Sequence, residues 1–264
     1  MNDRSVTDFT RLDRPDISAR LFHPRKDWDP QIGDEVLIPV ADTVTVGGRF
    51  HGVDKTGYNL LLFHGNGEIV SDYDEVSALY NRMGINFLVV DYRGYGFSGG
   101  EPTVSTMIQD CHTIFRFTET WLETKGYHRG LVLMGRSLGS ASVLELAAAH
   151  ADRIDGLVIE SGFAFAEPLL QLMGIDTGDL FDEKPDDFRH LEKIGSFFKP
   201  TLIIHAEKDH IIPFSDGQAL FDACPSSDKK LLKIPEANHN DIFLRGMPQY
   251  LQAVKALLDI TAEG

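Results

Sequence analysis

The chain has 264 residues, a formal net charge of −15 and 42% hydrophobic residues, which suits one large α/β domain. Its acidity argues against binding to nucleic acid, because that function requires a basic face. Two cysteines, a polar start and the lack of a long apolar stretch argue against a disulfide-rich secreted protein and against a membrane span, so we expect a cytoplasmic protein.

Taken in chain order, the predicted elements begin with an irregular leader, 1–34, which is polar, interrupted by three prolines and expected to pack on the domain. Two β-rich runs, 35–40 and 43–51, predict an antiparallel hairpin. From residue 58 onward, apolar runs typical of buried strands alternate with helical patterns. The expected strands are 58–63, 85–90, 131–134, 156–159, 201–205 and 230–234, and the expected helices are 69–83, 104–125, 140–150, 215–223 and 248–260.

This alternation predicts an α/β fold with an eight-stranded, mostly parallel sheet and helices on both of its faces. A single domain is expected over residues 35–264. Residues 161–200, after the sixth strand, show no strand pattern and predict a short lid insertion. Its apolar side chains either pack the lid on the body or line an acyl pocket. The candidates for the pocket are Phe163, Phe165, Leu169 and Met173.

Ser137 lies at the centre of the pentapeptide 135–139, Gly-Arg-Ser-Leu-Gly. A predicted strand leads into it and a helical pattern follows it. This arrangement, with a small residue two positions to either side, is typical of a nucleophile elbow, which holds a serine at strained backbone angles with its hydroxyl exposed. The pattern predicts that Ser137 attacks a carbonyl carbon.

A serine hydroxyl needs a base that takes its proton and a carboxylate that orients the base. Asp209 follows the expected seventh strand and His239 follows the eighth, so both would lie at the same edge of the sheet as Ser137. The chain order nucleophile, acid, base is the one that an elbow of this kind accompanies. We predict Ser137, Asp209 and His239 as the catalytic residues. Glu160, at the end of the sixth strand, is the alternative acid.

The expected third strand ends in the turn 63–67, Phe-His-Gly-Asn-Gly. Its glycines allow a tight turn that aims a backbone N–H towards the nucleophile. We predict that the N–H groups of Asn66 and Leu138, the residue after the nucleophile, form an oxyanion hole. His64 is expected to brace this turn through hydrogen bonds rather than to transfer protons.

Two rival motifs are better explained as structure. Residues 94–99 have the spacing of a dinucleotide-binding loop, but Pro102 follows where a helix should open, and no ribose-binding acid stands at the expected distance. His205, His210 and His239 lack the spacing of metal ligands. We therefore expect neither a cofactor nor a metal.

These motifs resemble those of α/β-hydrolase superfamily serine hydrolases, in the short-lid group that includes depalmitoylating α/β-hydrolase-domain proteins. The resemblance runs from about residue 35 to the C-terminus and rests on the segments 62–66, 91–100, 135–139, 209–213 and 239–241. It implies an α/β-hydrolase fold. It also implies the roles of nucleophile, acid and base for the three predicted catalytic residues, and carboxylic ester or thioester substrates.

We therefore expect a cofactor-independent serine hydrolase that acts on a small-molecule or acyl-group substrate. Two alternatives stay open: an amide or peptide hydrolase with the same catalytic residues, and a non-catalytic ligand-binding protein with the same fold. The presence of all three predicted residues favours an enzyme.

Overall fold

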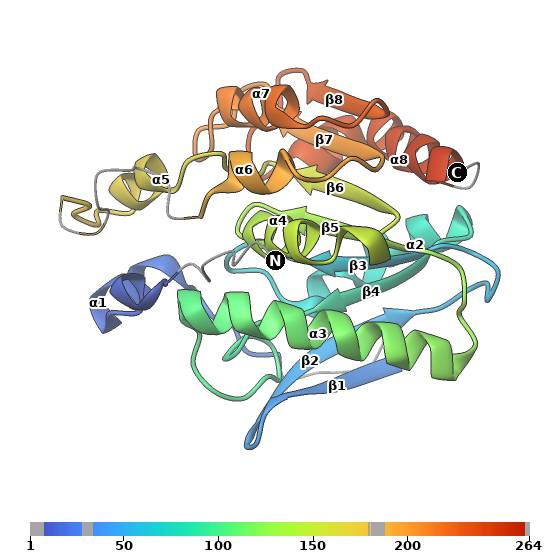
Figure 1. Ribbon diagram of the computed structural model, residues 1–264, viewed down its shortest axis with the longest axis horizontal. Coiled ribbons are helices and arrows are strands. Elements are labelled where there is room, and N and C mark those ends of the chain that lie inside the picture. The colour runs from blue at the N-terminus through green and yellow to red at the C-terminus, as the bar shows by residue number, and fades with distance from the viewer. Residues whose placement is uncertain (1–7, 28–33, 179, 181–187, 262–264) are drawn as a thin grey trace, which may run out of the picture.

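Eight strands form a single sheet in the computed structural model, which describes residues 8–27, 34–178, 180 and 188–261 (Figure 1). The strands are β1 (Asp34–Ala41), β2 (Val44–His51), β3 (Asn59–Phe63), β4 (Asn86–Val90), β5 (Leu131–Arg136), β6 (Gly156–Glu160), β7 (Thr201–Ala206) and β8 (Lys229–Ile234). Their order is β1-β2-β4-β3-β5-β6-β7-β8. Of the eight, only β2 runs against the common direction, because it pairs antiparallel with both β1 and β4 and the other pairs are parallel. The mostly parallel sheet predicted from the sequence is confirmed.

Helices cover both faces of this sheet, as the alternating pattern predicts. They are α1 (Pro15–Leu21), α2 (Asp74–Arg82), α3 (Val104–Lys125), α4 (Gly139–Ala149), α5 (Ala166–Leu172), α6 (His190–Ile194), α7 (Phe214–Ala223) and α8 (Ile242–Thr261), with short 3-10 turns at Thr10–Leu12, Val70–Tyr73 and Ala151–Arg153. In Figure 1, α3, α4, α6 and α7 lie on one face, and α2 and α8 lie on the other. α1 and α5 lie beyond one edge of the sheet.

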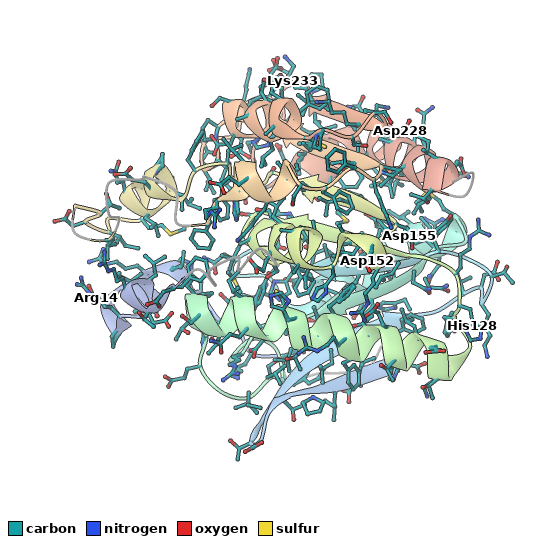
Figure 2. All side chains as sticks on the ribbon, viewed as in Figure 1. Arg14, His128, Asp152, Asp155, Asp228 and Lys233 are labelled. Carbon is teal, nitrogen blue, oxygen red and sulfur yellow. The ribbon has the colours of Figure 1, made fainter. Side chains whose placement is uncertain are left out.

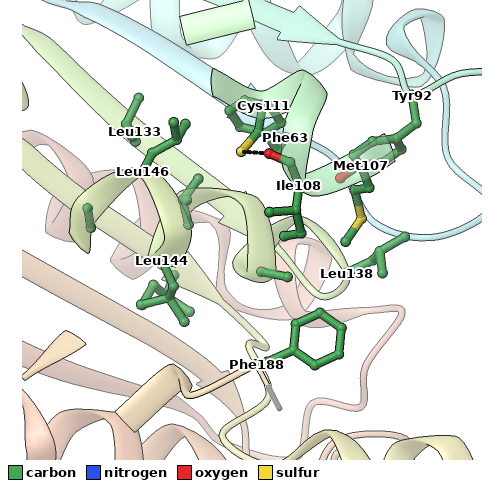
Figure 3. Close-up of a cluster of buried hydrophobic side chains, with 14 of the residues drawn as sticks. Phe63, Tyr92, Met107, Ile108, Cys111, Leu133, Leu138, Leu144, Leu146 and Phe188 are labelled. Atoms are coloured by element: carbon green, nitrogen blue, oxygen red, sulfur yellow. Dashed lines mark hydrogen bonds between the residues drawn. The ribbon is translucent and has the colours of Figure 1, made fainter. Parts of the chain in front are cut away.

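Both faces of the central strands are buried. Leu61 and Phe63 of β3 belong to the core under α3 and α4, whereas Leu60 and Leu62 belong to the core under α2 and α8. Because neighbouring residues of a strand point to opposite faces, two cores require a continuous apolar run, which is the pattern in the sequence. Figure 3 shows part of the first core, where strand side chains meet those of α3 and α4: Phe63, Leu133, Ile108, Cys111, Leu144 and Leu146.

The carboxyl ends of the parallel strands lie together at the edge next to α1 and α5, on the left of Figure 1. β3 lies between β4 and β5, so the chain proceeds from β3 first to one side and later to the other. Loops that leave such a point diverge and form a crevice, which is where open α/β sheets bind ligands. In Figure 2, His128, Asp155 and Asp228 mark the opposite edge, where loops enter the strands.

The N-terminal segment is more regular than predicted. Residues 8–27 include α1, which begins at Pro15, a residue whose fixed φ suits the first position of a helix. Ile17 and Leu21 of α1 are buried in the core that also contains α3 and α4. Apolar burial therefore orders a segment whose polar composition suggests a loop. Residues 1–7 and 28–33 of the predicted leader lie outside the described residues.

The predicted lid contains α5 and α6, and its described residues form no strand. α5 lies at the carboxyl edge of the sheet in Figure 1, whereas α6 packs beside α4 on the face of the sheet. The first half of residues 161–200 thus stands nearest to the crevice. Residues 179 and 181–187 of this insertion lie outside the described residues.

The last helix is longer than predicted. The sequence predicts a start at Pro248, because proline favours the first turn, but α8 begins at Ile242 and contains Pro248. Ile242 and Gly246 in the additional turns are buried, and a Cβ on Gly246 would lie 2.6 Å from the Ile234 side chain. This close packing on β8 compensates for the loss of the backbone hydrogen bond that a proline inside a helix cannot donate.

A charged cluster joins three of the helices. Glu145 on α4 lies 2.7 Å from Lys193 Nζ of α6 and 3.4 Å from His112 Nε2 of α3. Burial opposes ionisation of Glu145, but the contacts with His112 and Lys193 outweigh it and lower its pKa to about 2. Because this pKa lies below that of an unfolded glutamate, the carboxylate stabilises the fold above about pH 4 and loses its contribution as the pH falls towards about 2.

We predict that Glu145→Gln lowers the free energy of unfolding at neutral pH by on the order of 2 kcal/mol, and that its difference from the wild type shrinks on acidification. Urea unfolding of both proteins at a series of pH values measures this difference. Glu123→Gln, an exposed position on α3, is the matched control and should change little. A difference between Glu145→Gln and the wild type that stays constant down to about pH 3 would contradict the lowered pKa.

Candidate active site

A strand-to-helix turn holds Ser137 in a strained backbone conformation. Ser137 lies between Arg136, which ends β5, and Gly139, which begins α4, and it has a φ of 50°. Residues other than glycine rarely adopt this left-handed conformation. The N–H of Ser137 donates to the carbonyl oxygen of Glu160 over 2.8 Å, which ties the turn to β6.

The two glycines of the pentapeptide lie where backbones meet. A Cβ on Gly139 would lie 2.0 Å from the carbonyl oxygen of Phe63 at the end of β3. A Cβ on Gly135 would lie 2.5 Å from the carbonyl oxygen of Gly139. Both distances are far below a van der Waals contact with backbone atoms that cannot move independently. β3, β5 and α4 therefore meet only because no side chain stands between them.

We predict that Gly139→Ala destabilises the protein by at least about 2 kcal/mol, because the added methyl group overlaps a backbone oxygen of the central strand. Gly99→Ala is the control, since a Cβ there would come no nearer than 3.9 Å to another residue. Thermal or urea unfolding measures both variants. A Gly139→Ala protein as stable as the control would show that α4 does not need this close approach.

Three side chains at the carboxyl ends of β5, β7 and β8 form one hydrogen-bonded row. The Ser137 hydroxyl lies 3.0 Å from Nε2 of His239, and Nδ1 of the same imidazole lies 2.8 Å from Oδ2 of Asp209. Ser137 and His239 are both buried. In this arrangement the imidazole can accept the serine proton on Nε2 while Asp209 orients it through Nδ1–H. The structure thus brings together the three residues that the sequence predicts.

Asp209 is held as an anion. Besides the bond from His239, its Oδ1 accepts the N–H groups of Ile211 over 3.0 Å and Ile212 over 2.9 Å. Burial opposes ionisation of Asp209, but the bond from His239 and the two backbone donors outweigh it, so its pKa lies below the ordinary value. An ionised carboxylate stabilises the imidazolium that forms when the base takes a proton.

Glu160, the alternative acid, has other partners. Its carboxylate accepts hydrogen bonds from Nε of Arg136 over 3.1 Å and from the Tyr250 hydroxyl over 2.5 Å. Burial raises its pKa above the ordinary value, although Arg136 and Tyr250 oppose this shift. The two candidate acids therefore differ in their hydrogen-bond partners. Asp209 is bonded to the imidazole, whereas Glu160 is bonded to a guanidinium and a phenol.

The turn after β3 is held by the N-terminal segment. The side-chain amide of Asn66 donates to the carbonyl oxygen of Leu21 over 2.7 Å and accepts the N–H of His23 over 3.0 Å. The hydroxyl of Tyr95 donates to the same amide oxygen over 2.7 Å. Within the described part of the chain, the backbone N–H groups of Asn66 and Leu138, the two predicted oxyanion donors, have no hydrogen-bond acceptor.

His64 braces this turn from the core side. The side chain is fully buried, with Nδ1 2.8 Å from the carbonyl oxygen of Gly65 and Nε2 3.2 Å from Asp91 Oδ1. The hydroxyl of Tyr92 donates to the carbonyl oxygen of His64 over 2.7 Å. These contacts agree with the structural role expected from the sequence.

A pocket of about 310 Å³ opens beside Ser137. Of the four lid residues proposed for the acyl site, Leu169 and Met173 line this pocket. Phe163 is buried in an aromatic cluster, and Phe165 is 40% exposed; neither lines the pocket. The apolar spacing of the lid did not reveal which of its side chains face Ser137.

Sequence reasoning missed the walls of the pocket that come from outside the lid. Leu21 and His23 of the N-terminal segment line it, as do Ile211 and Asn240 from the loops after β7 and β8. The apolar patch at 17–22, in an otherwise polar leader, is the sequence signal that this segment packs on the body.

The two rival motifs form part of the framework. The N–H of Gly94 donates to the carbonyl oxygen of Gly99 over 3.0 Å and closes the loop, and the next helix begins only at Val104. His205 Nε2 lies 2.9 Å from the carbonyl oxygen of Ile212 and so supports the loop that carries Asp209. Among the residues with described positions, no three His, Cys, Asp or Glu side chains are grouped as metal ligands.

Comparison with known proteins places these features in a family context. Residues 55–175 match the family model described as "Serine aminopeptidase, S33". Human alpha/beta hydrolase domain-containing protein 17B is 32% identical over 208 residues, which cover 75% of this chain and 65% of that protein. An uncharacterized membrane protein of Saccharomyces cerevisiae is 30% identical over 179 residues, which cover 64% of this chain and 60% of that protein. The chain thus spans less than two thirds of the length of these relatives.

Solved structures share the fold. A soluble variant of monoglyceride lipase from Saccharomyces cerevisiae superimposes with a TM-score of 0.70 at 20% identity and covers 88% of this chain and 96% of its own. An esterase of Pyrococcus furiosus has a TM-score of 0.72 at 16% identity and covers 90% of this chain and 98% of its own. At these identities the likeness concerns the fold, and it confirms the expected α/β-hydrolase architecture.

The cytoplasmic location expected from the composition is contradicted by these relatives, one of which is named a membrane protein. In the described parts of the chain, no helix is both long and apolar enough to cross a bilayer. The sequence features behind this expectation concern only signal peptides and membrane-spanning helices. Proteins also associate with membranes through interfacial helices and lipid anchors. The prediction of a cytoplasmic protein is therefore withdrawn.

Proposed function

We propose that this chain, which belongs to the α/β-hydrolase superfamily, is a serine hydrolase that cleaves a carboxylic ester or thioester through an acyl-enzyme on Ser137. The observation that carries the proposal is the hydrogen-bonded row from Asp209 through His239 to the serine hydroxyl. This row offers an oriented base to an otherwise weak nucleophile. The pocket beside the hydroxyl gives a substrate access to it.

In the proposed reaction, Ser137 Oγ attacks the acyl carbon while its proton passes to Nε2 of His239. The backbone N–H groups of Asn66 and Leu138 hold the negative charge that develops on the carbonyl oxygen. His239 then gives the proton to the leaving alkoxide or thiolate. A water molecule, deprotonated by the same nitrogen, then attacks the acyl carbon, and His239 returns the proton to Ser137 Oγ as the acid leaves. Asp209 keeps the imidazole in the required tautomer throughout.

The walls of the pocket support an apolar acyl group of short to medium length. Five lining side chains are aliphatic or thioether: Leu21, Leu138, Leu169, Met173 and Ile211. The volume of about 310 Å³ lies at the lower end of the range of about 300–1,000 Å³ that is usual for small-molecule sites.

An amide or peptide hydrolase is the second candidate, because the family model that matches residues 55–175 is described as a serine aminopeptidase. Both reactions would use the same row of side chains and differ in the leaving group. Rates with an acetyl ester and an acetyl anilide of the same aromatic group separate the two candidates.

We predict that a fluorophosphonate probe labels the wild-type protein at Ser137 and leaves folded Ser137→Ala unlabelled, because only an activated serine reacts. Asp209→Asn should lower kcat on p-nitrophenyl acetate by about 10⁴-fold through loss of the correct imidazole tautomer. Glu160→Gln, which replaces the alternative acid, should lower it far less. Mass spectrometry of the adduct and steady-state kinetics are the measurements.

Two results would count against this mechanism. Folded wild-type protein without an adduct at Ser137 would leave a non-catalytic, ligand-binding role. Equal losses in Asp209→Asn and Glu160→Gln would remove the distinction between the two carboxylates.

We also predict that kcat/KM on p-nitrophenyl esters rises with acyl length until the pocket is filled. Met173→Trp, which narrows the pocket, should lower kcat/KM for the longer esters by at least about tenfold and leave the acetate almost unchanged. Phe165→Trp, in the same insertion but outside the pocket lining, is the matched control. A wild-type protein whose activity drops steeply beyond the acetyl ester would exclude the apolar wall as an acyl site.

A further inference from the structure

The side chain that precedes the nucleophile joins three segments of the active site. Nη1 of Arg136 lies 2.5 Å from Glu68 in the loop after β3, and its Nε lies 3.1 Å from Glu160 at the end of β6. Its Nη2 donates to the carbonyl oxygen of His239, after β8, over 3.0 Å. Each nitrogen of one planar group therefore contacts a different segment of the chain. The guanidinium is largely buried, with 13% of the side chain exposed.

The first carboxylate in this array controls the oxyanion turn. Oε2 of Glu68 accepts the backbone N–H of Gly65 over 2.7 Å, immediately before Asn66, and the Tyr73 hydroxyl over 2.6 Å. Burial opposes ionisation of Glu68, but Arg136 and Tyr73 outweigh it, and the pKa of Glu68 lies below its ordinary value. Glu68 thus links the guanidinium of Arg136 to the turn that carries Asn66, so the position of the turn depends on that of the guanidinium.

The second carboxylate belongs to the residue that holds the nucleophile. The carbonyl oxygen of Glu160 accepts the N–H of Ser137 over 2.8 Å, while its side chain accepts from Arg136 and Tyr250. The elbow and the guanidinium are therefore fixed to the same residue of β6. Without the cation, half-buried Glu68 and buried Glu160 would lack their common counter-charge.

Resting on the proposed function, we propose that Arg136 is a positioning residue that sets the imidazole of His239 and the oxyanion turn relative to Ser137. Its contact with the base is made through the backbone carbonyl of His239, so it orients the base without sharing its proton. Its contact with the oxyanion turn is made through Glu68. The side chain of Arg136, the residue before the nucleophile, thereby holds together parts of the site that are distant in the sequence.

The geometry explains why this position holds an arginine. A guanidinium presents five N–H donors in a rigid plane, whereas a lysine ammonium is a single point of charge on a flexible stem. Buried ion pairs contribute little net stability, since desolvation cancels much of the attraction, but their loss displaces the groups they hold. The expected effect of a change at Arg136 is therefore on rate more than on substrate binding.

The test compares Arg136→Ala with the wild type by the rate of Ser137 labelling with a fluorophosphonate, which needs no knowledge of the natural substrate. We expect a loss of about a hundredfold, as for a misplaced catalytic group, with KM for p-nitrophenyl acetate almost unchanged. Millimolar guanidinium chloride should restore part of the rate by entering the vacated position, because Arg136 lines the open pocket. Sodium chloride at the same ionic strength should not.

Arg93→Ala is the matched control. Arg93 is also largely buried, but both of its hydrogen bonds, over 2.6 and 2.8 Å, are to Asp110 of α3. Its removal should lower the thermal midpoint without a comparable loss of labelling rate, and guanidinium should not affect it. Arg136→Lys keeps the charge with less disturbance of folding, and it should remain about tenfold slower than the wild type because one ammonium cannot span the three acceptors.

The outcomes separate this inference from the proposed function. Folded wild-type protein that is not labelled at Ser137 would overturn both. Labelled wild type together with a folded Arg136→Ala or Arg136→Lys of the same rate would overturn the positioning role alone. The positioning role would also be overturned if Arg136→Ala and Arg93→Ala lost labelling rate equally and guanidinium did not restore the rate of Arg136→Ala. A loss specific to Arg136, restored by guanidinium, supports it.

Discussion

The close approach of three backbones at the nucleophile turn is the constraint on which the rest of the site depends. Because Gly139 carries no side chain, α4 begins directly against the end of β3. The start of α4, where the aligned peptide dipoles place a partial positive charge, therefore lies next to the turn that carries Asn66. Leu138, the residue before α4, and Asn66 both line the pocket with Ser137. A side chain at Gly139 would move Ser137 away from the proposed oxyanion donor on Asn66, however well His239 and Asp209 were aligned.

The topology of the sheet assembles the remainder. Ser137 and His239 are 102 residues apart in the chain, yet their strands end at one edge of the same sheet. β6 lies between β5 and β7, and its last residue, Glu160, holds the elbow by its backbone and Arg136 by its side chain. The row of hydrogen-bonded side chains is therefore connected to a second polar array, formed by Arg136 with Glu68 and Glu160, which is itself largely buried. Such an array adds little net stability, because desolvation cancels much of the attraction between its charges.

The parts of this molecule that follow from local pattern and topology could be predicted from the sequence. Alternating apolar runs and helical patterns indicated the sheet, and the placement of Asp209 and His239 after two later strands indicated the row with Ser137. The walls of the pocket could not be predicted in this way. Leu21 reaches Asn66 through a hydrogen bond between residues 45 apart, and no periodicity encodes such a contact. Phe163 shows the same limit, because an apolar side chain in a lid fits a pocket and an aromatic core equally well.

The hydrogen bonds between the N-terminal segment and Asn66 also affect what a sequence match can say. The stretch that matches the family model, 55–175, contains the nucleophile turn and the turn after β3 that carries Asn66. It excludes the proposed acid and base, Asp209 and His239, and several residues that line the pocket: Leu21, His23, Ile211 and Asn240. Relatives can therefore keep the recognisable stretch almost unchanged while the cavity around the serine diverges. Similarity over that stretch therefore covers the nucleophile turn and part of the pocket, whereas the remaining walls come from the flanking parts of the chain.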